Sequence, residues 1–152
     1  MKTVSLAVVS LVIGWLPALG GLLGMVGPWY DALNKSSLTP PGWVFGPAWS
    51  VLYTLIGISL FMYLRTGSKF MPVVTLTVFG VHLLLNFLWS VLFFRWHSPG
   101  FALADILVLC LSLVFIMYTF YRTGTTAWYL LVPYLLWLLF ATYLNLIIVV
   151  LN

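Results

Sequence analysis

Five long apolar stretches constrain this chain more than any other feature of its sequence. They cover residues 3–26, 44–64, 71–94, 101–121 and 128–150. A helix that crosses a membrane needs about 20 consecutive apolar residues, and each stretch reaches that length. The pattern therefore predicts five transmembrane helices in an all-α integral membrane protein.

The composition excludes a water-soluble fold. Of the 152 residues, 64% are hydrophobic and only 5% carry a charge. A soluble domain has about 25% charged residues, so this chain cannot cover a surface that faces water on all sides. We expect the lipid bilayer to be its solvent.

Short connections separate the last four stretches. Three of them, which begin at Arg65, Arg95 and Arg122, are about five residues long, so the helices that they join should pack as antiparallel neighbours. The first connection, residues 27–42, is about three times longer, and loops of that length are often functional. We expect a single domain over residues 1–152, an antiparallel bundle of five helices with a long loop between the first and second.

The basic residues of the loops predict an orientation, because cytoplasmic loops carry an excess of Lys and Arg. The side that holds the N-terminus carries four and the other side two: Lys2, Arg65, Lys69 and Arg122 against Lys35 and Arg95. This distribution favours a cytoplasmic N-terminus, with the long loop and the C-terminus outside.

The first apolar stretch admits more than one interpretation. Lys2 followed by an apolar run is typical of a signal peptide, but the run continues to the end of the stretch and further spans follow, so we expect a retained helix. Pro17 should kink this helix, because it lacks a backbone N–H. Gly20 and Gly24 have the spacing that lets another helix approach closely, for either dimerisation or internal packing.

The sequence offers little conventional chemistry. The basic residues stand singly at helix ends, whereas nucleic-acid binders cluster them on one face, so we expect no nucleic-acid partner. Cys110 is alone, which excludes an intramolecular disulfide. Asp31 lies in a loop and Asp105 in a span, so no carboxylate pair exists for acid–base catalysis. His82 and His97 lack Cys or Glu companions, and we predict neither a metal site nor a conventional enzyme.

An aromatic run follows the long loop. Two prolines and Gly42 interrupt regular secondary structure, and Trp43, Phe45 and Trp49 come next. Pro47 fits the first turn of a helix, where its missing N–H costs little. This run predicts that the second helix begins with a wall of rigid aromatic side chains.

Polar side chains of several spans fall in the half of the membrane next to the long loop. They are Trp49, Ser50, Tyr53, Asn86, Ser90, Asp105, Thr142, Tyr143 and Asn145, with Trp137 near the midplane. The pattern predicts a cavity beneath the loop, suited to a large, flat, mostly apolar ligand with one or two polar groups. The alternative assigns aromatic residues to the interfacial belt of membrane proteins. The belt accounts for Trp29, Tyr30, Trp96, Trp128 and Tyr129, but poorly for Trp49, Asn86 and Trp137.

Two titratable residues inside the spans have structural interpretations. Asp105 should lie near a helix N-terminus, where the macrodipole favours an anion, and should cap the helix or bridge to a neighbour. A proton relay would need a second intramembrane acid, which the sequence lacks. His82 lies deeper and is expected to be an interior histidine with its hydrogen bonds satisfied.

These residues carry a resemblance that covers essentially the whole chain. The motifs are Trp29-Tyr30-Asp31-Ala32-Leu33 with Lys35, Thr39-Pro40-Pro41-Gly42, Phe45-Gly46-Pro47, Trp49 with Leu52-Tyr53, Leu83 and Asn86 with Trp89-Ser90 and Phe93-Phe94, Asp105, Pro133-Tyr134 with Trp137, and Phe140-Ala141-Thr142-Tyr143-Leu144-Asn145. In their order and spacing the chain resembles the TspO/MBR family, the tryptophan-rich sensory proteins and translocator proteins once called peripheral-type benzodiazepine receptors.

The resemblance implies a five-helix bundle, often a homodimer, whose pocket the first loop closes. It also implies a bacterial cell membrane as the location, and porphyrins such as protoporphyrin IX and other haem-like tetrapyrroles, or benzodiazepine-type small molecules, as ligands, with no obligatory cofactor. The corresponding function would be tetrapyrrole sensing, transport or disposal, in a stress response. Alternatives are a true porphyrin transporter, a helper of another membrane protein, and light-dependent oxidative degradation of protoporphyrin IX.

The residues that would line or adjoin the pocket follow from the resemblance. They are Pro41, Phe45, Trp49, Tyr53, Asn86, Phe87, Trp89, Tyr134, Trp137, Ala141 and Leu144. Trp49 and Trp137 would be the catalytic residues if the photo-oxidative activity exists, because an indole stacked on an excited porphyrin can donate an electron.

The sequence also departs from the family pattern. Ser36 and Leu38 stand where relatives usually carry Pro and Trp, which implies a looser loop. His82 replaces the usual Gln and would add a protonatable group or an axial contact to a metalloporphyrin. No basic residue follows Tyr143, so specific cholesterol binding is not expected.

Overall fold

Four long helices form the body of the protein. The computed structural model describes residues 3–23 and 27–152, and in that part of the chain it contains helices and no strands. The long helices are α4 (Phe45–Arg65), α5 (Pro72–Ser90), α6 (Pro99–Arg122) and α7 (Val132–Leu151). Short 3-10 helices, η1 (Gly42–Val44) and η3 (Thr126–Leu131), precede α4 and α7, and η2 (Val91–Arg95) is a π-helical extension of α5.

With these extensions, four of the described helices are long and apolar enough to cross a membrane. Their bounds are Gly42–Arg65, Pro72–Arg95, Pro99–Arg122 and Thr126–Leu151. Prolines lie in the first turn of α5, α6 and α7, where a missing N–H is not needed. The prediction of an all-helical protein with these four membrane helices is confirmed.

The first apolar stretch is broken rather than merely kinked. It consists of α1 (Thr3–Trp15) and α2 (Ala18–Leu23). The break falls at Pro17, which has no N–H for an intrahelical hydrogen bond. The interruption predicted at Pro17 is therefore present, as a full break between two helices rather than a kink in one. The last three residues of the predicted span 3–26, with Gly24, lie outside the described part of the chain.

Glycines bring the broken segment against the bundle. A Cβ atom at Gly14 would lie 2.6 Å from the backbone N of Gly57 in α4, and one at Gly57 would lie 2.8 Å from the Cα of Leu11 in α1. Further along, a Cβ atom at Gly20 would lie 2.8 Å from the carbonyl oxygen of Phe87 in α5. Here Gly20 serves internal packing, one of the two roles that its spacing allowed.

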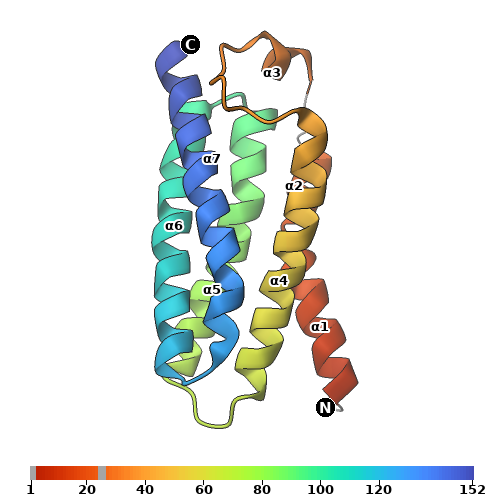
Figure 1. Cartoon of the computed structure of the whole chain (residues 1–152), viewed down its shortest axis with the longest axis vertical. Helices are drawn as coiled ribbons and strands as arrows, with labels where there is room; N and C mark the ends of the chain where they lie inside the picture. The colour runs from red at the N-terminus through yellow and green to blue at the C-terminus, as the bar shows by residue number, and fades with distance from the viewer. Residues whose placement is uncertain (1–2, 24–26) are drawn as a thin grey trace.

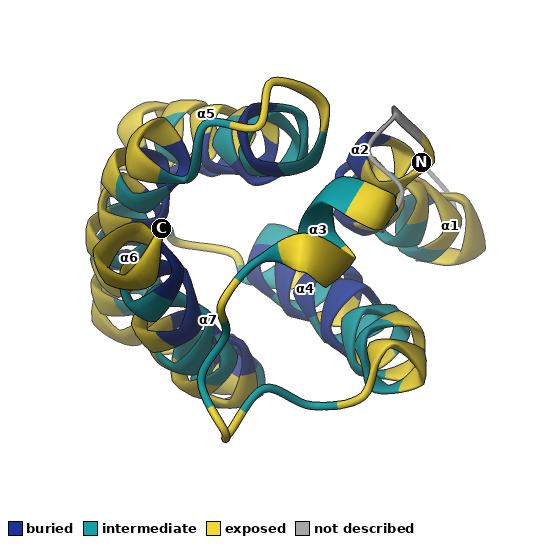
Figure 2. Cartoon of the chain, turned by 90° about the horizontal axis from the view of Figure 1, so that it is seen from above, coloured by how far each residue is buried: buried dark blue, intermediate teal, exposed yellow. Residues whose placement is uncertain are grey.

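The helices enclose a space that is covered at one end. Seen from above, α5, α6 and α7 form an arc, with α4, α1 and α2 on the opposite side (Figure 2). The short helix α3 (Pro28–Ala32) and the rest of the first loop lie across this end, at the top of Figure 1 beside the C-terminus. The described N-terminal part of α1 lies at the other end (Figure 1).

The first loop is attached to the end of α7. The backbone N–H of Asn34 donates to Asn152 Oδ1 over 2.9 Å, and Asn152 Nδ2 donates to the carbonyl of Asn34 over 3.1 Å. The Ser36 hydroxyl lies 3.1 Å from that of Tyr143. Lys35 Nζ donates to three carbonyl oxygens at the end of α3, over 2.6–3.1 Å. These contacts hold the loop as a cover over the space between the helices.

Candidate functional site

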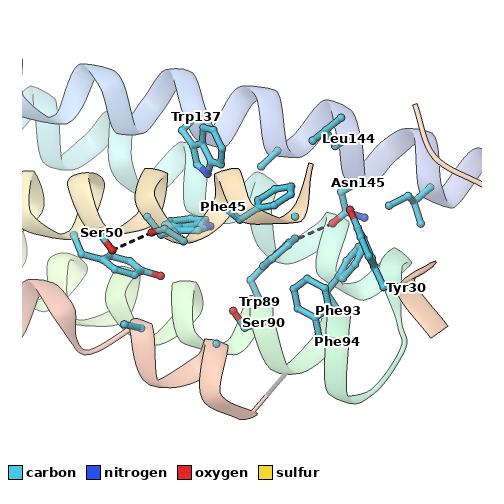
Figure 3. A pocket seen from close by; sticks show the side chains of 18 of the residues that line it. Tyr30, Phe45, Ser50, Trp89, Ser90, Phe93, Phe94, Trp137, Leu144 and Asn145 are labelled. Atoms are coloured by element: carbon cyan, nitrogen blue, oxygen red, sulfur yellow. Dashed lines mark hydrogen bonds between the residues drawn. The ribbon is translucent and has the colours of Figure 1, made fainter. Parts of the chain in front are cut away.

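A cavity of about 480 Å³ lies beneath this cover. Ligand sites in proteins typically measure about 300–1,000 Å³. Its walls come from α1, α2, α3, η1, α4, α5, η2 and α7, and nine of the lining side chains are aromatic. They are Trp15, Tyr30, Phe45, Trp49, Tyr53, Trp89, Phe93, Phe94 and Trp137. Figure 3 shows most of them around the hollow.

Trp49 and Trp137 form one corner of the cavity. Their ring centroids lie 6.2 Å apart at an interplanar angle of 82°. Tyr53 stacks on Trp49 at 5.2 Å and 26°, and Phe45 meets Trp137 edge-on at 6.1 Å. Offset-stacked and edge-to-face pairs of this kind are the favoured aromatic geometries, so each ring fixes the orientation of the next.

A second aromatic wall faces this corner. Trp89 stacks on Phe93 at 5.1 Å, and Phe94 meets both rings edge-on. The indole N–H of Trp89 donates to Asn145 Oδ1 over 3.2 Å, and Asn145 Nδ2 donates to the carbonyl of Pro99 over 2.8 Å. Asn145 thus brings an amide group to an otherwise apolar wall.

Three glycines leave bare backbone on the cavity wall. A Cβ atom added at Gly21, Gly42 or Gly46 would meet nothing within 4 Å. Close by, the Ser50 hydroxyl donates to the carbonyl of Gly46 over 2.9 Å, which leaves its oxygen free to accept. A flat ligand can therefore approach these parts of the wall more closely than any side chain would permit.

Most of the site residues that the sequence predicted lie together on this cavity. Seven line it: Phe45, Trp49, Tyr53, Trp89, Trp137, Ala141 and Leu144. Four do not. Pro41 is exposed in the loop, Phe87 is half-buried away from the cavity, and Tyr134 is fully buried beneath Trp49. Asn86 borders a second cavity of about 10 Å³, whose wall includes Trp49 and Ala141 of the main one.

Tyr30 was assigned to the interfacial belt, and the structure shows that this interpretation was wrong. The side chain lines the cavity and packs against Phe93 and Phe94 with ring centroids 6.1 and 5.7 Å away. Its neighbour Trp29 stacks on His97 at 4.2 Å, which helps to dock α3. Burial first, and the charge of Asp31 second, raise the pKa of Tyr30 above its usual 10.0.

His82 has its hydrogen bonds satisfied in the interior, as predicted. Its Nδ1 lies 2.8 Å from the hydroxyl of Ser112, and its Nε2 lies 2.9 Å from that of Tyr134. The residue does not line the cavity, and neither ring nitrogen is free. The expectation of an axial contact from His82 to a metalloporphyrin is therefore wrong for this structure.

Asp105 is placed differently from the prediction. It lies six residues after Pro99, the first residue of α6, and so cannot cap that helix. The carboxylate is buried, and its Oδ2 has no hydrogen-bond partner among the described residues. Within residues 3–23 and 27–152, no three His, Cys, Asp or Glu side chains come together as metal ligands would.

Several lining residues were not predicted to contact the ligand. Phe93 and Phe94 belong to the motifs without a predicted role, whereas Asn145 is one of the polar side chains that predict the cavity. Trp15 and Gly21 come from the broken first stretch. For the first stretch, the sequence signal is Trp15 and Ala18, an aromatic and a small residue on either side of Pro17. A break at Pro17 turns this segment toward the bundle.

A model of the TspO/MBR family matches residues 6–151. The chain belongs to the TspO/MBR family.

Individual relatives within the TspO/MBR family cover most of the chain. The tryptophan-rich protein TspO of Chlorobaculum tepidum is 42% identical over 125 residues, which are 82% of this chain and 79% of that protein. The translocator protein of Homo sapiens is 34% identical over 147 residues, covering 86% and 87%. The tryptophan-rich sensory protein of Cereibacter sphaeroides is 36% identical over 129 residues, covering 85% and 80%. Together with the four apolar helices, family membership identifies an integral membrane protein.

Proposed function

We propose that this protein binds flat, mostly apolar tetrapyrroles such as protoporphyrin IX in the cavity beneath the first loop, for their sensing, transport or disposal. The observation that carries the proposal is the shape and chemistry of this cavity: about 480 Å³ walled by nine aromatic side chains. Aromatic rings and bare glycine backbone offer flat faces to a planar macrocycle. Ser50 and Asn145 supply a few polar groups at its edges.

The proposal includes the arrangement in the membrane. We propose that α1 and α2 together form a fifth span, which completes the wall of the cavity with Trp15, Ala18 and Gly21. The bundle would then hold its N-terminus on the cytoplasmic side, by the Lys and Arg distribution. The covered end of the cavity would face the opposite side.

Tryptophan fluorescence tests the binding. Protoporphyrin IX titrated in the dark into purified protein should quench the emission saturably, because two of the eight tryptophans form the cavity corner. A variant with Trp49→Phe and Trp137→Phe should lose the part of the quenched signal that comes from these two indoles, and keep the part from Trp15 and Trp89, which also line the cavity. Trp128→Phe is the matched control, since Trp128 stacks on Tyr129 away from the cavity. Quenching that does not saturate would refute the proposal.

A second candidate function is light-dependent oxidative degradation of the bound porphyrin. The contact between Trp49 and Trp137 at 6.2 Å supports it, because both electron-rich indoles border the same ligand space. The double Phe variant should then keep much of its porphyrin binding and lose the bleaching of the pigment under illumination. Bleaching at an unchanged rate would remove this candidate.

A further inference from the structure

A file of hydrogen-bonded side chains runs through the core directly beneath the cavity. It passes from Ser112 through His82, Tyr134 and Asn86 to Tyr53, over distances of 2.8, 2.9, 2.6 and 3.2 Å. His82, Tyr134 and Asn86 are at most 4% exposed, whereas Tyr53 lines the cavity. The binding site proposed above uses Tyr53 alone among these residues, which leaves the rest of the file to be explained.

One serine sets the direction of the whole file. The Ser112 hydroxyl has a single proton and donates it to the carbonyl of Leu109 over 3.0 Å. Its oxygen can therefore only accept from His82 Nδ1, which must carry a hydrogen. An uncharged imidazole has one N–H, so Nε2 of His82 is an acceptor.

The remaining hydrogen bonds follow in turn. Nε2 of His82 accepts the O–H of Tyr134, so the Tyr134 oxygen accepts from Asn86 Nδ2. That orientation of the amide leaves Asn86 Oδ1 to accept the O–H of Tyr53. Reversing the direction would require Ser112 to turn its hydrogen from Leu109 to His82, and the Asn86 amide to flip from the orientation in which Nδ2 faces Tyr134 and Oδ1 faces Tyr53.

Two tyrosines of the file hold the indole of Trp49. Tyr53 stacks on it at 5.2 Å and 26°, and Tyr134 meets it edge-on at 6.2 Å and 66°. Both tyrosine hydroxyls are anchored in the file, so neither ring can turn without breaking a buried hydrogen bond. The orientation of a cavity wall thus depends on residues that do not touch the cavity.

We propose that His82 is a positioning residue for ligand binding: as acceptor for the Tyr134 hydroxyl it fixes Asn86, Tyr53 and the Trp49 indole on which a planar ligand packs. The inference rests on the proposed function, because it assigns His82 a role in the same cavity. Glutamine can accept at its oxygen and donate at its nitrogen, so it should be able to take over the role of His82. An apolar residue should not.

Binding of protoporphyrin IX to three variants tests the role. His82→Leu leaves the Tyr134 hydroxyl without an acceptor, so Asn86, Tyr53 and the Trp49 indole lose their fixed orientation and binding should weaken about tenfold, the scale of one net hydrogen bond. His82→Gln should remain within about twofold of wild type, since it can restore both hydrogen bonds. Tyr121→Phe, an exposed tyrosine outside the cavity, is the matched control and should not change the affinity.

A spectroscopic measurement separates this role from simple support of the fold. The chain has two histidines, so in a His97→Gln background the ¹⁵N NMR signals of the remaining ring report the tautomer of His82. We expect the Nδ1–H form alone, and a mixture of both tautomers in Ser112→Ala, which removes the group that sets the direction.

The outcomes distinguish the inference from the proposed function. An Nε2–H tautomer in the wild type, or unchanged affinity in a folded His82→Leu variant, would overturn the inference and leave the proposed function intact. Equal losses in His82→Gln and His82→Leu would also overturn it, because rescue by glutamine would be absent. No saturable binding by the wild type would overturn the proposed function itself.

Discussion

The contact between α1 and α4 yields the sharpest stability prediction. In Gly14→Ala, the new Cβ would lie 2.6 Å from the backbone N of Gly57 and 2.8 Å from the carbonyl oxygen of Tyr53, whereas ordinary contacts begin at 3.4 Å. Both neighbours are backbone atoms of a helix, so no side-chain rotation relieves the clash. The two helices must separate by several tenths of an ångström, and Trp15 must move with α1.

Overpacking of this kind typically costs about 1–3 kcal/mol. At about 2–4 °C per kcal/mol for a chain of this size, the Tm of Gly14→Ala should fall by roughly 2–12 °C. Thermal unfolding of the detergent-solubilised protein, followed by circular dichroism, measures the shift.

Gly80→Ala is the matched control for this prediction. A Cβ at Gly80, on the exposed side of α5, meets nothing within 4 Å, and replacing a helical glycine by alanine stabilises a helix by up to about 1 kcal/mol. Its Tm should stay the same or rise. If Gly14→Ala were as stable as Gly80→Ala, the close packing of α1 on α4 would be refuted.

Three further predictions concern the cavity, its cover and the core. Gly21→Leu should occupy part of the cavity and weaken the saturable quenching by protoporphyrin IX without lowering the Tm, since a Cβ there meets nothing within 4 Å; unchanged binding would contradict the location of the site. Because burial raises the pKa of Tyr30 above 10.0, α3 should stay docked below pH 10 and loosen as Tyr30 ionises at higher pH; a pH titration of tryptophan fluorescence should show this alkaline step in the wild type and not in Tyr30→Phe. Ser59→Ala removes the donor to the buried carbonyl of Ala127 at 2.9 Å and should lower the free energy of unfolding by about 1–3 kcal/mol, measured by chemical denaturation; an unchanged value would show that another donor takes over.

The sequence predicted the long helices well because hydrophobic length alone specifies them. The predicted span 44–64 corresponds to Gly42–Arg65, and 101–121 corresponds to Pro99–Arg122. It predicted the first stretch less well. Proline loses the same hydrogen bond whether a helix bends or stops, and the outcome depends on the helices against which the two parts pack.

For the cavity, the sequence predicted which face of each helix lines it, but not how deep the cavity extends into the bundle. Tyr134, Trp137, Ala141 and Leu144 recur at the spacing that places them on one side of α7. Three of them line the cavity, whereas Tyr134, one turn deeper, is sealed beneath Trp49. The floor is set by how closely Trp49 of α4 approaches α7, which no spacing within one helix reveals.

The division of the first apolar segment at Pro17 has a consequence for the range of molecules that the cavity can admit. Backbone contact at Gly14 and Gly57 holds α1 against α4, whereas Gly20 packs α2 on α5, between the carbonyl oxygen of Phe87 and the side chain of Ser90. The two halves of the segment are therefore anchored to different helices: Trp15 follows α4, and Ala18 and Gly21 follow α5. The width of this side of the cavity is thus set by the separation of α4 and α5, and a guest that spread those two helices would open the segment at Pro17.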